Sequence, residues 1–151
     1  MSEDKFTQKA TAVLQDAQQS AAMNYHQEMT SRHVFQALVK DRDGIVDYIL
    51  IQAKIEPGLI EAKAAQLVKN QPSVRGQESD LRWNTAMVRV MALAEKLAKD
   101  AQDEYISVEH LLMAIAEDGD SDVVQACRDF GLTRAKIREW SREFRKGQNV
   151  T

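Results

Sequence analysis

The chain has 151 residues, of which 44% are hydrophobic and 28% charged, and its net charge is −3. This balance is typical of one or two folded domains and argues against a disordered tail or binding of nucleic acid by bulk attraction. No apolar run approaches the roughly 18 residues of a membrane-spanning helix, no signal peptide is evident and Cys127 is the single cysteine, so we expect a cytoplasmic protein without disulfides or membrane contact.

The first half of the chain is predicted to form four helices. Apolar residues at spacings of three and four mark one face of a long helix over residues 6–21. Thr30 has the position and chemistry of an N-cap for a second helix. Asp43 and Gly44 then interrupt the chain before a short apolar helix around residues 46–50. Pro57, at the tolerated first helical position, opens a fourth helix.

The second half repeats this order. Apolar residues over 87–98 form the long face, and Ser107 is the equivalent cap. Gly119 and Asp120 form the equivalent break, and residues 131–133 start the last helix. No stretch alternates apolar and polar residues with β-branched side chains, so no sheet is expected.

A shift of the sequence against itself supports two copies of one unit. When residues 6–63 are aligned with 83–140, nine positions are identical, whereas chance would give about three or four. Apolar positions also coincide. We predict an all-α fold of eight helices, arranged as two four-helix repeats related by pseudo-twofold symmetry. The predicted boundaries are residues 1–70 and 81–146 for the repeats, 71–80 for the connection and 147–151 for the start of a further linker.

Motifs for catalysis are missing from the sequence. It contains no phosphate-binding loop, no dinucleotide-binding glycine pattern and no nucleophile elbow. His33 and His110 could be taken for a catalytic or metal-binding pair, yet neither has the spacing of a metal motif. Because both repeats keep this histidine early on a short helix, we favour a structural role for it. His26 has no partner in the other repeat and is expected in an exposed loop.

Two matching segments resemble a known family. Residues 30–38 are TSRHVFQAL and residues 107–115 are SVEHLLMAI. A pair of four-helix repeats with this pattern resembles the N-terminal domain of the Clp ATPases. The linker QPSVRG at 71–76 and the tail GQNVT at 147–151 are most similar to the ClpB-type disaggregases within that family. ClpC-type members share the double repeat.

The resemblance implies a function. ClpB-type proteins are heat-shock chaperones that act as AAA+ ATPases in homohexamers and extract polypeptides from aggregates together with DnaK-type chaperones. Their N-terminal domain engages exposed apolar segments of unfolded or aggregated proteins. ATP and Mg²⁺ would bind in later modules, so we expect neither an active site nor a cofactor nor a metal in this chain.

The resemblance also suggests a substrate-binding site. Family members carry functional polar residues at positions that correspond to Thr7, Asp103 and Glu109. The same comparison points to an apolar strip, which comprises Met91, Leu93 and Leu97.

The first repeat has polar residues opposite Leu93 and Leu97, so these two leucines either pack between the repeats or form an exposed docking patch. Family members often have leucine at the position of His110, which changes the extent of such a patch. We expect Thr7, Asp103 and Glu109 to cluster at the surface with Leu93 or Leu97 beside them.

Three other functions remain open. A ClpC-type domain would dock adaptor proteins for a Clp protease. A nucleic-acid-binding module would use the basic final helix over 133–146, although we favour a solvated face there. A hydrolase is the least supported alternative, since no nucleophile and base can be named. The methionines and Cys127 are expected mainly in the core.

Overall fold

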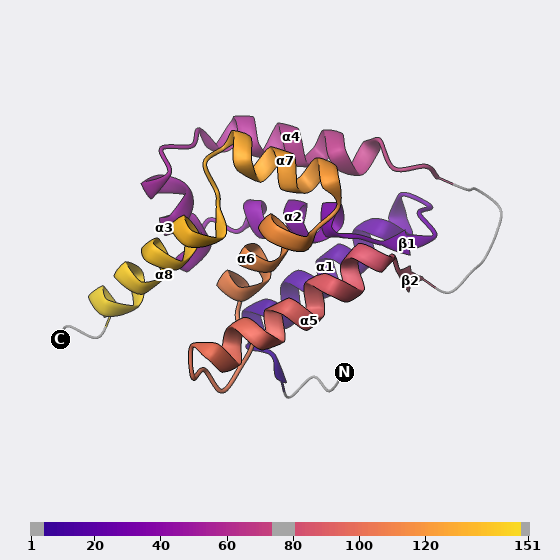
Figure 1. Cartoon of the computed structure of the whole chain (residues 1–151). Helices are drawn as coiled ribbons and strands as arrows, with labels where there is room; N and C mark the ends of the chain where they lie inside the picture. The colour runs from indigo at the N-terminus through magenta and orange to yellow at the C-terminus, as the bar shows by residue number, and fades with distance from the viewer. Residues whose placement is uncertain (1–4, 74–80, 149–151) are drawn as a thin grey trace.

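The computed structural model describes residues 5–73 and 81–148, which form eight helices and two very short strands (Figure 1). The elements are α1 (Gln8–Met23), β1 (Glu28–Met29), α2 (Ser31–Lys40), α3 (Ile45–Gln52), α4 (Pro57–Lys69), β2 (Arg82–Trp83), α5 (Thr85–Asp100), α6 (Val108–Asp118), α7 (Ser121–Asp129) and α8 (Arg134–Gln148). The predicted all-α fold is confirmed. Within the predicted connection and tail, residues 74–80 and 149–151 lie outside the described part of the chain.

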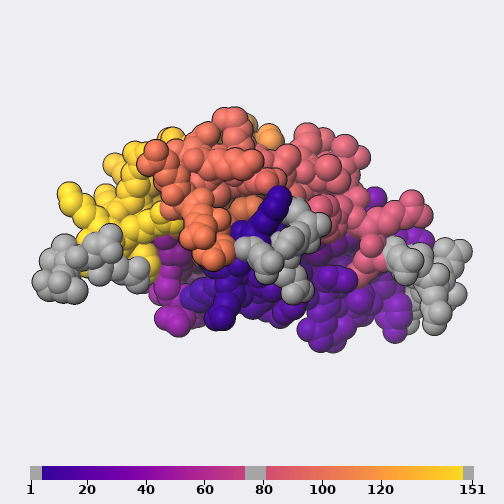
Figure 2. Space-filling view, turned by 90° about the horizontal axis from the view of Figure 1, so that it is seen from below, coloured from indigo at the N-terminus to yellow at the C-terminus, as the bar shows by residue number. Residues whose placement is uncertain are grey.

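The two sets of four helices correspond to each other. A shift of 77 residues carries the bounds of α1 onto those of α5, and the bounds of α2, α3 and α4 fall within two residues of those of α6, α7 and α8. In Figure 1, α2 and α6 lie at the centre, α4 runs beside α7 and α3 beside α8. Figure 2 shows the first unit along one side of the molecule and the second along the other. Each short helix of one unit therefore packs on the last helix of the other.

The ends of the helices repeat with the same register. Tyr25 and Gln102 have left-handed backbone conformations with φ of 58° and 60°, and Lys54 and Gly131 do so with φ of 59° and 75°. In each case the backbone doubles back and satisfies carbonyls of the preceding helix, as in a Schellman motif. Three of these four positions hold a residue with a Cβ atom, for which this conformation is unfavourable.

Parallel backbone pairing links the two units, contrary to the expectation that no strand would form. Glu28 and Met29 pair with Arg82 and Trp83, and Phe6 forms an isolated bridge with Ile106. The two pairings are equivalent, because a shift of 77 residues relates Met29 to Ile106 and Phe6 to Trp83. Strands of two residues are too short to show alternation in the sequence, which is why they were not predicted.

The core consists mainly of aliphatic side chains from all eight described helices. Four of the six methionines, Met29, Met87, Met91 and Met113, are buried, whereas Met23 is 70% exposed. Cys127 is fully buried, and burial raises its pKa to about 12. No helix in the described ranges is long and apolar enough to span a bilayer.

Candidate functional site

The residues predicted for the site lie around α5, but at different places. Thr7 is the N-cap of α1: its hydroxyl accepts a hydrogen bond from the Ala10 amide at 3.1 Å. Its own amide donates to the carbonyl of Ile106 at 3.0 Å. Ile106 lies in the segment that connects Asp103 to Glu109, so Thr7 sits beside this loop as expected.

Met91 forms part of a shallow hollow between α1 and α5, with a volume of about 230 Å³. Its lining comprises Phe6, Thr11, Leu14, Gln15, Gln18, Trp83 and Met91. Met91 itself is only 2% exposed and makes the floor, whereas Trp83 is 42% exposed. Thr7 is one turn before Thr11 on the same helix. We call this the Trp83 hollow.

Asp103 and Glu109 meet at a different place, where α8 crosses α6. The guanidinium of Arg145 donates two hydrogen bonds of 2.9 Å to Asp103 and bonds of 3.0 and 2.6 Å to Glu109. The Glu109 carboxylate also accepts hydrogen bonds from Ser107 and Ser141. Two carboxylates from the loop and α6 are thus held by one arginine of α8.

The structure changes the predicted site in two respects. Glu109 is 3% exposed, so the expected surface position is wrong for this residue. Its carboxylate is buried because Arg145 neutralises it. Leu97 is 1% exposed and packs in the core, so it provides no exposed docking patch, while Leu93 is partly buried against the core. Leu97 lines a second hollow, on the α8 side of α5 and separate from the Trp83 hollow.

His110 has a structural role within this cluster. Its Nδ1 accepts the Ser107 amide at 2.9 Å and completes a capping box at the start of α6. The proton of the neutral ring is therefore on Nε2, which donates to Asp103 at 3.0 Å. Burial lowers the pKa of His110, which favours this neutral form. The ring fixes the loop that carries Asp103.

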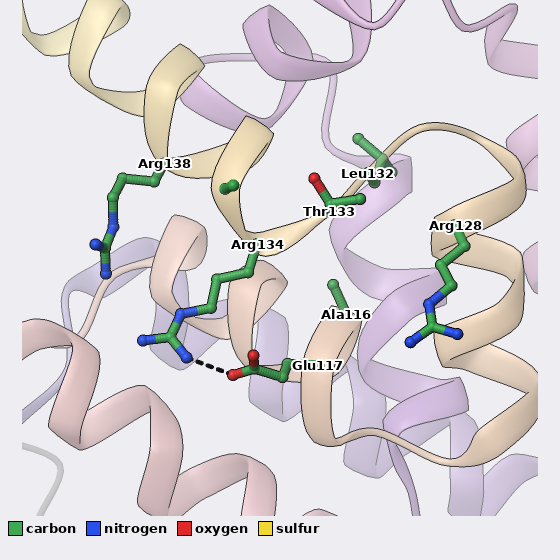
Figure 3. A pocket seen from close by; sticks show the side chains of 8 residues that line it. Ala116, Glu117, Arg128, Leu132, Thr133, Arg134 and Arg138 are labelled. Carbon is green, nitrogen blue, oxygen red and sulfur yellow. Dashed lines mark hydrogen bonds and ion pairs between the residues drawn. The ribbon is translucent and has the colours of Figure 1, made fainter.

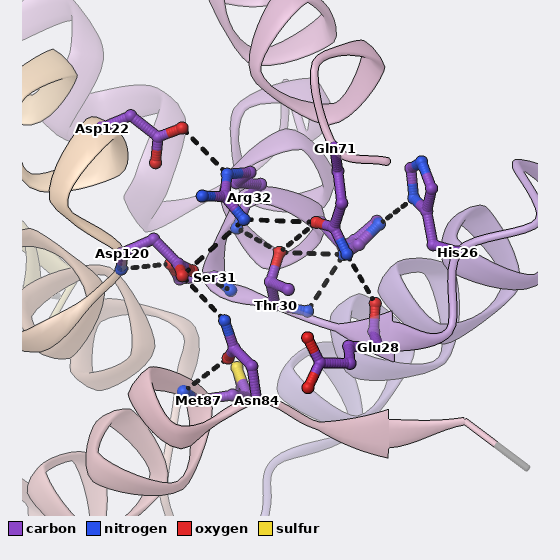
Figure 4. A network of polar contacts seen from close by, with 11 residues as sticks. His26, Glu28, Thr30, Ser31, Arg32, Gln71, Asn84, Met87, Asp120 and Asp122 are labelled. Atoms are coloured by element: carbon purple, nitrogen blue, oxygen red, sulfur yellow. Dashed lines mark hydrogen bonds and ion pairs between the residues drawn. The ribbon is translucent and has the colours of Figure 1, made fainter. Parts of the chain in front are cut away.

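The equivalent place in the first unit holds two histidines (Figure 4). His33 Nδ1 accepts the Thr30 amide at 3.0 Å, and its Nε2 lies 2.8 Å from Nδ1 of His26. His26 is 6% exposed, so the prediction of an exposed loop is wrong. The left-handed turn at Tyr25 folds the chain back onto α2 and buries the ring. Burial, with smaller contributions from His26 and Arg32, lowers the pKa of His33 to about 4.

A polar network extends from this pair across the seam between the units (Figure 4). Arg32 donates to Asp122 at 2.9 Å and to Gln71 at 3.3 Å. Asp120 accepts from the Ser31 hydroxyl at 2.5 Å and from Asn84, the N-cap of α5, at 2.7 Å. These contacts join α2, α5 and α7, and among the described residues the buried Oδ1 of Asp122 is left without a hydrogen-bond partner.

Comparison with known proteins identifies the family of this chain. Residues 5–130 match the family described as the Clp repeat (R) N-terminal domain. The chain belongs to this family. It is 30% identical over 148 residues to the chaperone protein ClpB 2 of Nostoc sp., covering 98% of this chain and 17% of that protein. The chain therefore spans about a sixth of the length of this curated relative.

Solved structures agree on the fold of this Clp N domain. The Hsp104 N-terminal domain from Candida albicans superposes with a TM-score of 0.81 at 20% identity, covering 93% of this chain and 91% of that one. A complex of the ClpV N-domain with a VipB peptide superposes with a TM-score of 0.71 at 16% identity, covering 89% and 83%.

Residues 5–73 and 81–148 contain no group of three histidine, cysteine or acidic side chains that could hold a metal ion. The sequence pattern did not identify two residues of the surfaces around α5, Arg145 and Trp83. The basic final helix predicts a solvated position for Arg145, and the alignment of the repeats pairs Trp83 with Phe6 without assigning it to a site. Phe6 and Trp83 occupy equivalent positions and are both apolar, which indicates that they contribute to one apolar surface.

Proposed function

We propose that this Clp N domain engages substrates for a ClpB-type disaggregase, by binding exposed apolar segments of unfolded or aggregated proteins. The Trp83 hollow carries the proposal, because it combines exposed aromatic area with polar side chains at its rim. Apolar area supplies affinity, and Gln15 and Gln18 of α1 can bond to the backbone of an extended client. The Trp83 ring offers a rigid face that fits many apolar sequences.

The parent protein in this proposal is an AAA+ ATPase that assembles as a homohexamer and works with DnaK-type chaperones. ATP and Mg²⁺ would bind in its other modules, and this domain would contribute no catalysis. A small hollow gives weak binding to one domain. Six copies on one ring would raise the effective concentration of sites for a long client.

Binding of a permanently unfolded protein tests the proposal. We expect Trp83→Thr to weaken capture of fluorescein-labelled, reduced and carboxymethylated α-lactalbumin about tenfold, because burial of the exposed ring area is lost. Threonine is suited to the short strand β2. Leu59→Thr is the matched control, since Leu59 is 59% exposed on α4 and lies outside the hollow. Fluorescence anisotropy gives the affinities.

Melting temperatures of both variants show whether either change acts through folding. Equal losses of affinity for Trp83→Thr and Leu59→Thr would show that capture is spread over the whole surface and would contradict the proposal. Unchanged affinity for Trp83→Thr at unchanged stability would also contradict it. Leu93→Ser gives a further test of the predicted strip, with a loss of stability expected from its partial burial rather than a direct loss of binding.

A further inference from the structure

A row of arginines follows one face of α8. Arg134, Arg138 and Arg142 are four residues apart, which places successive side chains above one another along the helix. Two hollows lie beside this row and share Arg134 and Arg138 in their linings. One hollow, of about 560 Å³, lies between the ends of α6 and α7 and the start of α8. The other, of about 370 Å³, lies between α8, the end of α5 and α6.

The arginines of the row differ in their partners. Arg134 pairs with Glu117 at 2.5 Å across the first hollow, and Figure 3 shows that Arg134 and Arg138 extend from α8 to the same side. Among the described residues, Arg138 and Arg142 form no ion pair or hydrogen bond through their guanidinium groups. Asp100 is the acidic residue in the lining of the second hollow, and it pairs with Lys96 at 2.9 Å.

Arg145 marks the end of the row. It also lines the second hollow, but Asp103 and Glu109 neutralise it and hold it in place. Within the row, Arg138 and Arg142 thus keep unused hydrogen-bond donors, and Arg134 is available at the cost of its partly exposed pair with Glu117. Arg128 of α7 adds a further cation to the lining of the first hollow. A guanidinium presents paired N–H groups that match a carboxylate.

We propose that this arginine row binds an extended acidic segment of a partner protein, with carboxylates on alternate residues. Residues four apart on a helix rise by about 6 Å. Alternate residues of an extended strand point to the same side and are about 6.6 Å apart. Alternate glutamates of an extended peptide therefore reach successive arginines without a change of conformation.

The surroundings favour an acidic peptide over a nucleic acid. The chain has a net charge of −3, and Glu139 and Glu143 on the same helix weaken attraction to a long polyanion. The aromatic ring in the lining of the two hollows is that of His110, which is only 2% exposed and therefore offers no free face on which a base could stack. The row shares no lining residue with the Trp83 hollow, so it is a second binding surface with a different chemistry.

Fluorescence anisotropy with synthetic peptides tests the row on the whole chain. The probe is a labelled peptide with glutamate on alternate residues and serine between them, measured at low and at moderate salt. The double variant Arg138→Gln with Arg142→Gln should bind about tenfold more weakly, since two partly exposed ion pairs are lost. Lys136→Gln with Lys146→Gln is the matched control. It removes the same charge from the same helix, at residues outside both hollows.

Three further measurements test whether the ligand is recognised by its carboxylates and their spacing. Asp100→Asn should strengthen binding two- to threefold, because it removes a repelling charge from the lining. The same peptide with glutamine in place of glutamate should not bind. A peptide of the same composition with its glutamates in one block should bind more weakly than the alternating peptide.

Several results would overturn the proposal. Equal losses for the arginine and lysine double variants would show non-specific attraction to the helix. Binding of a single-stranded oligothymidine more tightly than of the alternating peptide would assign the row to nucleic acid instead. Both double variants should keep the melting temperature of the parent chain, so an unfolded protein does not explain a loss. Client capture at the Trp83 hollow should be unaffected by the arginine variant, which separates this test from that of the proposed function.

Discussion

Replacement of Arg145 by glutamine is expected to destabilise the fold substantially. Arg145 is the shared partner of Asp103 and Glu109, and its side chain is 39% exposed whereas that of Glu109 is 4% exposed. Without the guanidinium, Glu109 keeps only its contacts with Ser107 and Ser141. A buried carboxylate would then face α8 without a countercharge.

The magnitude follows from the burial of the pair. Breaking a fully buried ion pair costs about 3–5 kcal/mol, and an exposed pair contributes about 0–1 kcal/mol. Arg145 is two-fifths exposed, so we discount the buried value and expect a loss of about 2–3 kcal/mol for Arg145→Gln. For a chain of this length, that corresponds to a fall of about 4–12 °C in the melting temperature.

Urea unfolding followed by tryptophan fluorescence measures the effect, with Trp140 on α8 as one reporter. Arg134→Gln is the control, because it makes the same substitution on the same helix in a pair that is one-third exposed or more on both sides. We expect its loss to stay below about 1 kcal/mol. Adding Glu109→Gln to Arg145→Gln should recover part of the stability and show a coupling of about 1–2 kcal/mol. Equal losses for the two arginines, or no coupling, would refute a role for Arg145 as the countercharge of a buried carboxylate.

Two further predictions concern stability and protonation. Lys54→Gly should raise the free energy of unfolding by about 0.5–1 kcal/mol, because φ is 59° at this position and glycine adopts that conformation without strain. Gly131→Ala at the matched position should lower the free energy of unfolding by about 1 kcal/mol. Urea unfolding measures both changes, and a loss of stability for Lys54→Gly would contradict the reasoning. His33 has a pKa of about 4 in the folded state against about 6.5 unfolded, so the unfolded chain binds the proton first and stability falls as the pH drops from about 6.5 towards 4, by about 2 kcal/mol at pH 5 from this group. Its ring signals in an NMR titration should have a midpoint near 4, and a midpoint near 6.5 would show that His33 is not desolvated.

The sequence predicted what the two units have in common. Thr30 and Ser107 cap equivalent helices, and their histidines complete the capping boxes. Such features are local: a cap and its partner lie three residues apart, so the pattern of one segment contains both. The same holds for the apolar faces of α1 and α5, whose spacing alone decides which side is buried.

Features that depend on how distant helices cross were not predictable. The residue that corresponds to Arg145 in the first repeat is Val68, so comparison of the repeats does not indicate an arginine held by two carboxylates at this position. Its contact with Glu109 depends on the rotation of α8 over α6, which helical periodicity does not determine. Leu97 and Leu93 could not be told apart in the sequence for the same reason: the way in which α5 packs against α6 decides which of the two is covered. His26 was misplaced because the turn at Tyr25 is left-handed without a glycine to indicate it.

The reciprocal backbone pairing has a consequence for how the chain holds together. The segment before α1 bonds to the second unit through Thr7, Ile106 and Lys5, while the segment before α5 bonds to the first through β1 and β2. The segment before the first helix of each unit thus forms backbone hydrogen bonds with the other unit, as in a domain-swapped dimer that has been fused into a single polypeptide. The paired segment of each unit therefore has its hydrogen-bond partner in the other unit. Residues 5–73 and 81–148 are held to each other by this pairing and by the contacts between their helices, so either piece alone would lack its partner's strand.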